Sequence, residues 1–417
     1  MSDFEVLVGI DWGASNHQAA LVDPDGQLLG NRSFSHDGAG LAAMADWILA
    51  RTAAAVDAIG VAIEVPHGPV VEAMMERGFT VHSLNPKQLD RFRDRFSPAG
   101  AKDDSRDALT LADALRTDRR FFRRLKSDTA EVVELREWTR IANELTSERT
   151  RLVNRLRQQL WRYYPQFLKV ASDLSKSWVP ELWKLAPTPA KARRLRPATI
   201  ETFLKNRRVR VVSAQDVLKQ FREPAIAVAP GTAEAAVAHI RVIVNRLHLV
   251  ARELSNAHRQ MDRLTAAVAA ALENPGTGPG TEPQRDVTIL ASLPGVGRIV
   301  LATLLSEALE PLRRRDYQAL RCLCGVAPVT RRSGKSLVVK RRLAAHKRLQ
   351  DAVYHWAGIA VLRDPICKAK YAALRARGHG HARALRSIGD RLIAVACAML
   401  TSQTEFDRDL SPSSSAA

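Results

Sequence analysis

The sequence lacks the features of membrane and secreted proteins. It contains no run of about eighteen consecutive apolar residues, so we expect no membrane-spanning segment. The first residues, MSDFEVLVGIDWG, include acidic side chains where a secretory signal peptide needs positive charge. We therefore expect a cytoplasmic protein.

Cysteine is scarce and is poorly placed for a zinc site. All four cysteines fall in the last quarter of the chain, and the first two stand one residue apart in an apolar run with no second pair nearby. Zinc-binding sequences use two such pairs at characteristic spacings. We expect the cysteines to be reduced residues of the core, namely Cys322, Cys324, Cys367 and Cys397.

Acidic residues are fewer than basic ones. The chain has 44 Asp and Glu against 63 Lys and Arg, a net charge of +19 and a pI near 10.3, which favours a polyanionic partner. The charge is segregated, since residues 1–110 carry 9 basic and 16 acidic side chains, and residues 285–400 carry 22 basic and 7 acidic ones. This segregation predicts a carboxylate site in one domain and a phosphate-binding surface in the other. A charge that serves solubility, or a basic binding protein without a catalytic site, is the alternative.

Strand patterns open the chain. Three of them follow one another at 5–11, 18–23 and 27–35, separated by a loop and by the turn at 24–26, and predict an antiparallel meander. Helices and strands then alternate, which predicts a mixed sheet with helices on its faces. The expected elements are helices at 40–53, 68–77, 86–95 and 105–115 and strands at 57–64 and 79–84.

The middle of the chain, residues 126–273, has the pattern of long amphipathic helices. Apolar residues recur at spacings of three, four and seven along two stretches, 135–160 and 237–264. The first helix should end before Pro165, and the second should cover 232–273. Two long helices around an irregular insert predict an antiparallel, coiled-coil-like arm, with a plain helical domain as the alternative.

Composition divides the remainder. Residues 274–286 are rich in Gly and Pro and should form a linker. Residues 287–402 predict a mostly helical C-terminal domain, and residues 403–417, which end in SPSSSAA, a disordered tail. Residues 1–125 form the predicted α/β domain.

Four carboxylates are placed where they can converge. Asp11 and Glu64 each end a predicted strand, while Asp104 and Asp107 stand three apart on one face at the start of a helix. Converging carboxylates repel one another unless a divalent cation neutralises them, and Mg²⁺ prefers such oxygen ligands. Two ions of this kind activate the attacking oxygen and stabilise the leaving one in phosphodiester chemistry. Each acid alone also suits a turn or helix cap, although the wholly apolar strand before Glu64 favours a functional role.

These residues carry a resemblance to a known family. The segments VGIDW around Asp11, AIEVP around Glu64 and KDDSRDA at 102–108 resemble the RuvC-type, ribonuclease-H-like domain of the DEDD transposases of bacterial insertion sequences. In that family four acids in this order bind divalent metal, the third and fourth within a K-x-D-x-x-D-A motif. The resemblance implies that Mg²⁺ or Mn²⁺ is bound by four catalytic acids, Asp11, Glu64, Asp104 and Asp107.

A Pro-Gly-x-Gly turn at 294–297 precedes an apolar helix and is typical of a helix-hairpin-helix-like motif. The backbone N–H groups at Gly295 and Gly297, the helix dipole and the neighbouring Arg298 together suit a DNA phosphate. A plain glycine turn between packed helices is the alternative.

Residues 325–336, GVAPVTRRSGKS, combine basic and hydroxyl side chains. On composition alone they suit a phosphate-binding loop in which the serines donate hydrogen bonds. The G-x-A-P…S-G pattern is similar to the C-terminal domain of the same transposases, where the serine before the glycine is a nucleophile, which implies that role for Ser333. A serine hydroxyl needs help in losing its proton and in stabilising the developing charge. The expected nucleic-acid contacts of this region are Arg331, Arg332, Lys335, Lys340, Arg341 and Arg342.

The resemblance implies a function and partners. It implies a nucleoid-associated insertion-sequence transposase that cleaves and exchanges strands of donor and target DNA, is directed by a structured guide RNA encoded by the element, and works as a homodimer or tetramer. A Holliday-junction-resolvase-like nuclease, which needs the acids but no serine, is the alternative within the same chemistry. An actin-like ATPase or sugar kinase would use Asp11–Gly13 as a phosphate loop, but we find no second loop of this kind in the sequence. A non-enzymatic packaging protein would need none of the acids.

Overall fold

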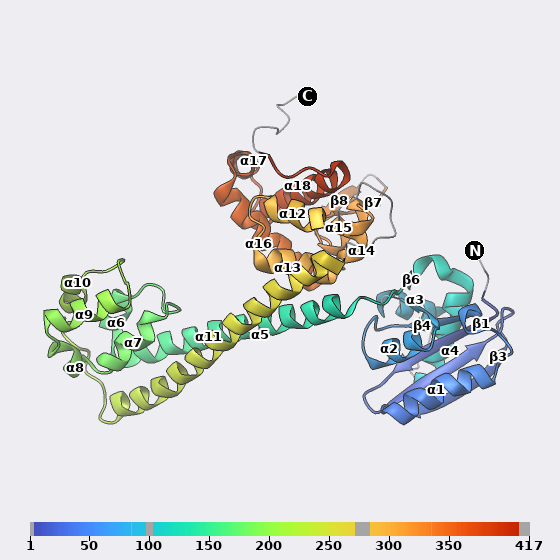
Figure 1. The fold of residues 1–417 in the computed structure, drawn as a ribbon, viewed down its shortest axis with the longest axis horizontal. Helices are drawn as coiled ribbons and strands as arrows, with labels where there is room; N and C mark the ends of the chain where they lie inside the picture. The colour runs from blue at the N-terminus through green and yellow to red at the C-terminus, as the bar shows by residue number, and fades with distance from the viewer. Residues whose placement is uncertain (1–3, 85, 97–102, 272–283, 335, 408–417) are drawn as a thin grey trace. The chain divides into compact units, whose positions relative to one another are not determined.

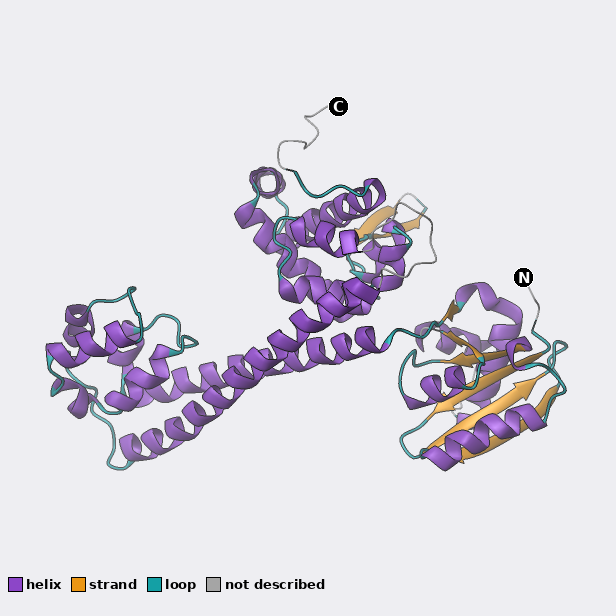
Figure 2. Ribbon diagram, in the orientation of Figure 1, coloured by secondary structure: helices purple, strands orange, loops and turns teal. Residues whose placement is uncertain are grey.

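The computed structural model describes residues 4–84, 86–96, 103–271, 284–334 and 336–407. The chain forms two compact units, Met1–Asp128 and Thr129–Ala417, and each is described by itself (Figure 1). The first unit is mixed α/β and the second is almost entirely helical (Figure 2). Among the described helices, none combines the length and the apolar composition needed to cross a membrane.

A six-stranded mixed sheet forms the centre of the first unit. Its spatial order is β3-β2-β1-β4-β5-β6. The first three strands pair antiparallel, which confirms the predicted meander, whereas β4 and β5 run parallel to β1 and β6 pairs antiparallel with β5. The strands are β1 (Val6–Trp12), β2 (Asn16–Val22), β3 (Leu28–Ser35), β4 (Ile59–Ile63), β5 (Thr80–Ser83) and β6 (Arg123–Arg124).

Helices cover both faces of this sheet, as the alternation of side chains along β1 requires. Val6, Val8 and Ile10 pack with residues of α1 (Gly38–Ala50) and α2 (Pro69–Glu76). Leu7 packs on the opposite face with residues of α3 (Pro86–Phe96) and α4 (Asp104–Asp118). Odd-numbered positions of β1 therefore face α4, and Asp11 follows in that alternation. Two 3₁₀ turns complete the unit, at Val56–Ala58 and Arg119–Phe121.

The second unit begins with two long helices that pack along each other, α5 (Ala130–Tyr163) and α11 (Thr232–Ala271). The early part of α5 shares a core with the late part of α11, and the reverse holds at the other end, so the pair is antiparallel. Helix α5 ends before Pro165, as predicted. The insert between the two helices is not irregular, which corrects our expectation. It contains α6 (Pro165–Val170), α7 (Trp178–Leu185), α8 (Pro189–Arg193), α9 (Pro197–Asn206) and α10 (Ala214–Phe221).

The insert has its own hydrophobic core. Tyr164, Phe167 and Phe221 form an aromatic cluster with ring centroids 5.5 to 6.0 Å apart. The helices of the insert are five to ten residues long, too short to show the periodicity from which helices are recognised in a sequence.

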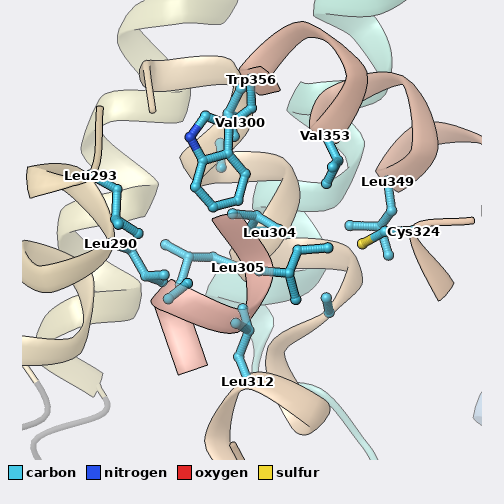
Figure 3. Packing of buried hydrophobic residues seen from close by; sticks show 14 of the residues in the cluster. Leu290, Leu293, Val300, Leu304, Leu305, Leu312, Cys324, Leu349, Val353 and Trp356 are labelled. Carbon is cyan, nitrogen blue, oxygen red and sulfur yellow. The ribbon is translucent and has the colours of Figure 1, made fainter. Parts of the chain in front are cut away.

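The last part of the second unit is a helical domain with one hairpin. Trp356 is buried at its centre among leucines of neighbouring helices (Figure 3), and its indole N–H donates to the carbonyl of Pro294 at 3.0 Å. The same core includes the first turns of α5 and the last turns of α11. The elements are α12 (Gln284–Ser292), α13 (Arg298–Glu307), α14 (Leu309–Arg313), α15 (Tyr317–Leu323), β7 (Val329–Ser333), β8 (Ser336–Lys340), α16 (Lys347–Arg363), α17 (Pro365–Ala376) and α18 (His381–Ser402).

Two expected boundaries change. Helix α12 begins at Gln284, so the last residues of the predicted linker are helical, while its earlier residues 274–283 lie outside the described part. Residues 403–407 pack back on α12, where the Phe406 backbone N–H donates to the Ser292 hydroxyl at 2.8 Å. This part of the predicted tail is ordered because Phe406 covers the core, and residues 408–417 lie outside the described part.

Candidate active site

Two of the predicted acids lie side by side at one edge of the sheet. In the parallel pairing of β1 with β4, Ile10 lies opposite Ile63, so the next residues of the two strands are Asp11 and Glu64. The strand β4 is buried throughout, and Glu64 is the first partly exposed residue after it. Alternation places both carboxylates on the face that α4 covers.

The other two acids stand in the first turn of α4. A Cβ atom built on Gly9 would lie 1.9 Å from the carbonyl oxygen of Ala108, so only glycine lets α4 lie directly on β1. This close approach brings the start of α4 over the end of β1. Asp104 is exposed, and Asp107 is only 2% exposed. The neighbouring Asp103 caps the helix, and its carboxylate accepts from the Ser105 backbone N–H at 3.4 Å.

Glu64, Asp104 and Asp107 all act electrostatically on Asp11. The pKa of Asp11 is raised from 3.8 to about 6, mainly by burial and then by the negative charges of Asp107, Asp104 and Glu64, in that order. The guanidinium of Arg93 acts in the opposite direction. A carboxylate whose pKa is raised by like charges favours binding a proton or a cation, so the site is one where positive charge is stabilised.

Arg93 of α3 supplies positive charge to the cluster. Its Nε and one terminal nitrogen donate to both oxygens of Asp107 at 2.6 and 2.9 Å. Its other terminal nitrogen donates to Asp90 at 2.6 Å. Asp107 is thus a buried carboxylate held by a bidentate guanidinium, one of the strongest hydrogen-bonding geometries in proteins.

A polar network ties α4 to the sheet beside Asp11. Gln18 lies opposite Asp11 in the β1–β2 pairing. The Gln18 amide donates to the Asn31 side chain, whose own amide nitrogen donates to the hydroxyl of Ser105 and to its carbonyl. Because Ser105 stands between Asp104 and Asp107 in α4, this chain of bonds holds the helical acids in register with β1.

The four carboxylates are of the type that binds a divalent cation, but their arrangement is too loose to hold one. All four side chains are carboxylates, the ligands that Mg²⁺ and Mn²⁺ prefer. Within the described residues, however, no three His, Cys, Asp or Glu side chains form a group tight enough to hold a metal ion. The bidentate contact with Arg93 occupies Asp107. The residues therefore fit a metal by the type of their side chains but not by their spacing in this structure.

The predicted residues of the C-terminal domain belong to the second unit. Ser333 ends β7 and pairs with Ser336 across the β7–β8 hairpin. Ser333 is exposed, as are Arg331, Arg332 and Lys340 on the same hairpin, and Lys335 lies outside the described residues. This two-stranded hairpin replaces the phosphate-binding loop that composition suggested. The apolar residues of β8, Leu337, Val338 and Val339, are 43% to 63% exposed.

The remaining residues predicted to contact nucleic acid differ in their burial and in their partners within the protein. Arg341 donates to the side chain of Gln350 at 2.8 Å, and Arg342 is partly buried. Gly295, at φ +86°, forms the turn between α12 and α13, and Gly297 caps α13, as the helix-hairpin-helix prediction requires. Arg298 forms an ion pair with Asp262 of α11 at 2.8 Å, so it is partly neutralised.

Sequence reasoning missed the residues that position the acids. A glycine in the middle of an apolar strand signals close approach of another backbone, so Gly9 was detectable in principle. Arg93 and the network of Gln18, Asn31 and Ser105 leave no such signal, because each depends on which strands and helices become neighbours.

Comparisons with known proteins identify relatives of this chain. Residues 8–165 match a family model described as a transposase of the DEDD type, and residues 287–372 match one described as the transposase IS116/IS110/IS902 family. A protein of Streptomyces coelicolor named as a mini-circle transposase for IS117 is 31% identical over 96% of this chain and 95% of its own. The IS110 protein of the same organism is 26% identical over 97% and 96%. A protein of Sinorhizobium fredii named as a transposase, y4uE, is 56% identical over 48% of this chain, and the match spans 56% of that protein.

These matches identify the class of protein to which the chain belongs. Both family models and two of these relatives carry the name transposase, and transposases are enzymes that cleave and rejoin DNA. Because a relative 31% identical aligns with nearly the whole of both chains, this chain belongs to the IS116/IS110/IS902 family of insertion-sequence transposases. The DEDD domain family matched by its N-terminal residues is typically metal-dependent.

Proposed function

We propose that this enzyme transposes its insertion sequence by metal-dependent cleavage and exchange of DNA strands, with a serine as the attacking group. The observation that supports the proposal is that Asp107, Asp104 and Glu64 all act electrostatically on Asp11, whose pKa is raised to about 6 by burial and by these three charges. A mixed sheet that opens with an antiparallel meander and continues with parallel strands also supports a ribonuclease-H-like, RuvC-like domain.

The four carboxylates are proposed to hold Mg²⁺, or Mn²⁺ in its place. Such ions, when bound, lower the pKa of an attacking oxygen and neutralise charge on the leaving one. The protein's own contribution is the placement of the acids: Gly9 sets α4 on β1, and the network through Asn31 and Ser105 fixes the helical pair. Arg93 keeps Asp107 neutralised and ordered until cation and DNA arrive.

Ser333 is proposed as the nucleophile on a DNA phosphate. Its Oγ forms a bond to phosphorus, the bond from phosphorus to one sugar oxygen breaks, and that oxygen takes up a proton as it leaves. The serine proton passes to a base during attack. Arg331 and Arg332 precede Ser333 on an exposed hairpin and can neutralise charge that develops on the phosphate. The hairpin is accessible on both strands, as an attacking group that must meet duplex DNA requires.

Ser333→Ala separates this mechanism from a resolvase-like nuclease. With labelled donor and target DNA, the variant should bind both and cleave neither. Each of Asp11→Asn, Glu64→Gln, Asp104→Asn and Asp107→Asn should also abolish cleavage and leave binding near that of the wild type, since removal of negative charge reduces repulsion of phosphate. Cleavage by Ser333→Ala at the wild-type rate would assign the reaction to the acids alone.

The partners proposed with this function are donor and target DNA, a structured guide RNA from the element, and further copies of the chain in a dimer or tetramer. The support is the net charge of +19 and the family membership. Purification of the protein from cells that carry the element, followed by sequencing of the bound RNA, tests the guide. Recovery of random cellular RNA in its place would contradict it.

A further inference from the structure

The helical insert carries basic charge that the proposed reaction does not use. Residues 165–223 contain 13 Lys and Arg against 5 Asp and Glu. They pack into their own core at the end of the α5–α11 pair, while the hairpin that carries Ser333 belongs to the domain at the other end of that pair (Figure 1). The charge is therefore held well away from the serine.

Much of this charge gathers at the two ends of α9. Arg194 and Arg196 precede the helix, and Lys205, Arg208 and Arg210 lie at or after its end; we call these five residues the α9 basic cluster. All five are exposed, and within the described residues none of their side chains forms an ion pair. Most acids of the insert are engaged elsewhere, as with Glu181, which holds Lys184, Arg207 and His248.

The backbone at Arg208 is strained in a way that a charge requirement explains. Its φ is +52°, the left-handed region that favours glycine. The residue ends α9, where the Val209 N–H donates to the Leu204 carbonyl at 2.9 Å, and glycine is the usual residue at this position. An arginine there accepts a conformational cost, and such strain clusters at functional positions.

The dimensions of α9 fit the major groove of B-form DNA. Ten residues span about 15 Å, and the groove is about 12 Å wide, so the two ends of the helix can reach phosphates on opposite sides of it. The outward face between the ends is small and polar: Ala198, Thr199 and Thr202 are exposed, while Ile200 and Leu204 are buried. Glu201 is the acid on that face. The deep, narrow major groove of A-form RNA does not admit such a helix.

We propose that the α9 basic cluster is a second DNA-binding site, which grips duplex DNA across its major groove at a distance from the Ser333 hairpin. Contacts to phosphate at both ends of α9 dominate its affinity, and the site therefore orients a DNA arm without requiring a particular sequence. It is independent of cleavage, so it can be tested separately from the proposed reaction.

The test is the salt dependence of binding by the full-length protein, measured by fluorescence anisotropy with a labelled duplex of about 30 base pairs in EDTA. Arg194→Gln with Arg196→Gln should reduce the slope of log K against log salt by about 2, and Arg208→Gly by about 1. Arg208→Gly removes the charge and relieves the backbone, so its unfolding temperature should equal or exceed that of the wild type.

Lys169→Gln provides the matched control. It removes one positive charge from the same insert, as Arg208→Gly does, but Lys169 is already paired with Glu223 at 2.6 Å, so the slope should not change. Slopes of both α9 variants equal to that of the wild type would overturn the proposal, as would an equal loss with Lys169→Gln. A loss seen with an RNA duplex and not with DNA would also overturn it, because it would assign the cluster to RNA.

Discussion

Asp11→Asn should stabilise the metal-free protein at neutral pH. The pKa of Asp11 in the folded protein is about 6 against an ordinary value of 3.8, so folding favours its protonated form. The contribution of Asp11 is therefore favourable below about pH 4 and is lost as the pH rises through about 6. At pH 8 the ionised carboxylate opposes folding, and asparagine removes that opposition.

The size of the effect follows from the same value. A rise from 3.8 to about 6 corresponds to about 3 kcal/mol for a fully buried group, and the partial exposure of Asp11 reduces this to about 1 kcal/mol. Calorimetric unfolding in EDTA should show this gain at pH 8 and none at pH 4. Saturating Mg²⁺ should stabilise the wild type and leave Asp11→Asn unchanged.

Asp25→Asn is the control, because Asp25 is an exposed turn residue of the same unit and its loss should have no such effect. An Asp11→Asn protein no more stable than the wild type at pH 8, or equally stabilised at pH 4, would refute the account of Asp11 as a buried acid among like charges.

Three further predictions concern the residues that position the acids. Gly9→Ala should cost at least about 3 kcal/mol of stability, since its Cβ would lie 1.9 Å from a backbone oxygen of α4. Gly38→Ala is the control and should cost little, because its Cβ would meet no atom within 4 Å. Equal unfolding temperatures of the two variants would contradict this packing. Arg93→Gln should destabilise the metal-free protein by about 3 kcal/mol, because it leaves Asp107 as an unpaired buried carboxylate. Mg²⁺ should then stabilise this variant more than it stabilises the wild type. A smaller response to Mg²⁺ would show that Arg93 does not compete with the cation. Asn31→Ala should lower the cleavage rate of bound DNA by about tenfold with little change in DNA affinity, because the hydrogen bond from Asn31 to Ser105 orients the acids of α4. Loss of DNA binding would instead give Asn31 a different role.

The order of strands and helices and the positions of the acids were accessible from the sequence. The continuous apolar runs of β1 and β4 predict that both strands are buried and that Asp11 and Glu64 stand at their ends, and the structure has this register. The spacing of Asp104 and Asp107 predicts one helix face, and α4 begins at Asp104. These features are local, so the pattern of a few residues determines them.

Features that depend on long-range packing were not accessible. Arg93 reaches Asp107 only because α3 and α4 share one face of the sheet, and nothing near Arg93 in the chain indicates this. The five helices of the insert leave no helical pattern in the sequence, because each is short and several begin with proline. Their helical form depends on a shared core around Phe167 and Phe221, which tertiary packing creates.

The central proposal is that DNA cleavage needs both the four acids and Ser333. A nicked suicide substrate, incubated with the protein and Mg²⁺ and resolved under denaturing conditions, measures it directly. The wild type should form a covalent protein–DNA adduct. Ser333→Ala and Asp11→Asn should each form none while still binding the substrate. Release of cleaved, protein-free DNA by Ser333→Ala at the wild-type rate would contradict the claim and leave a metal-dependent nuclease.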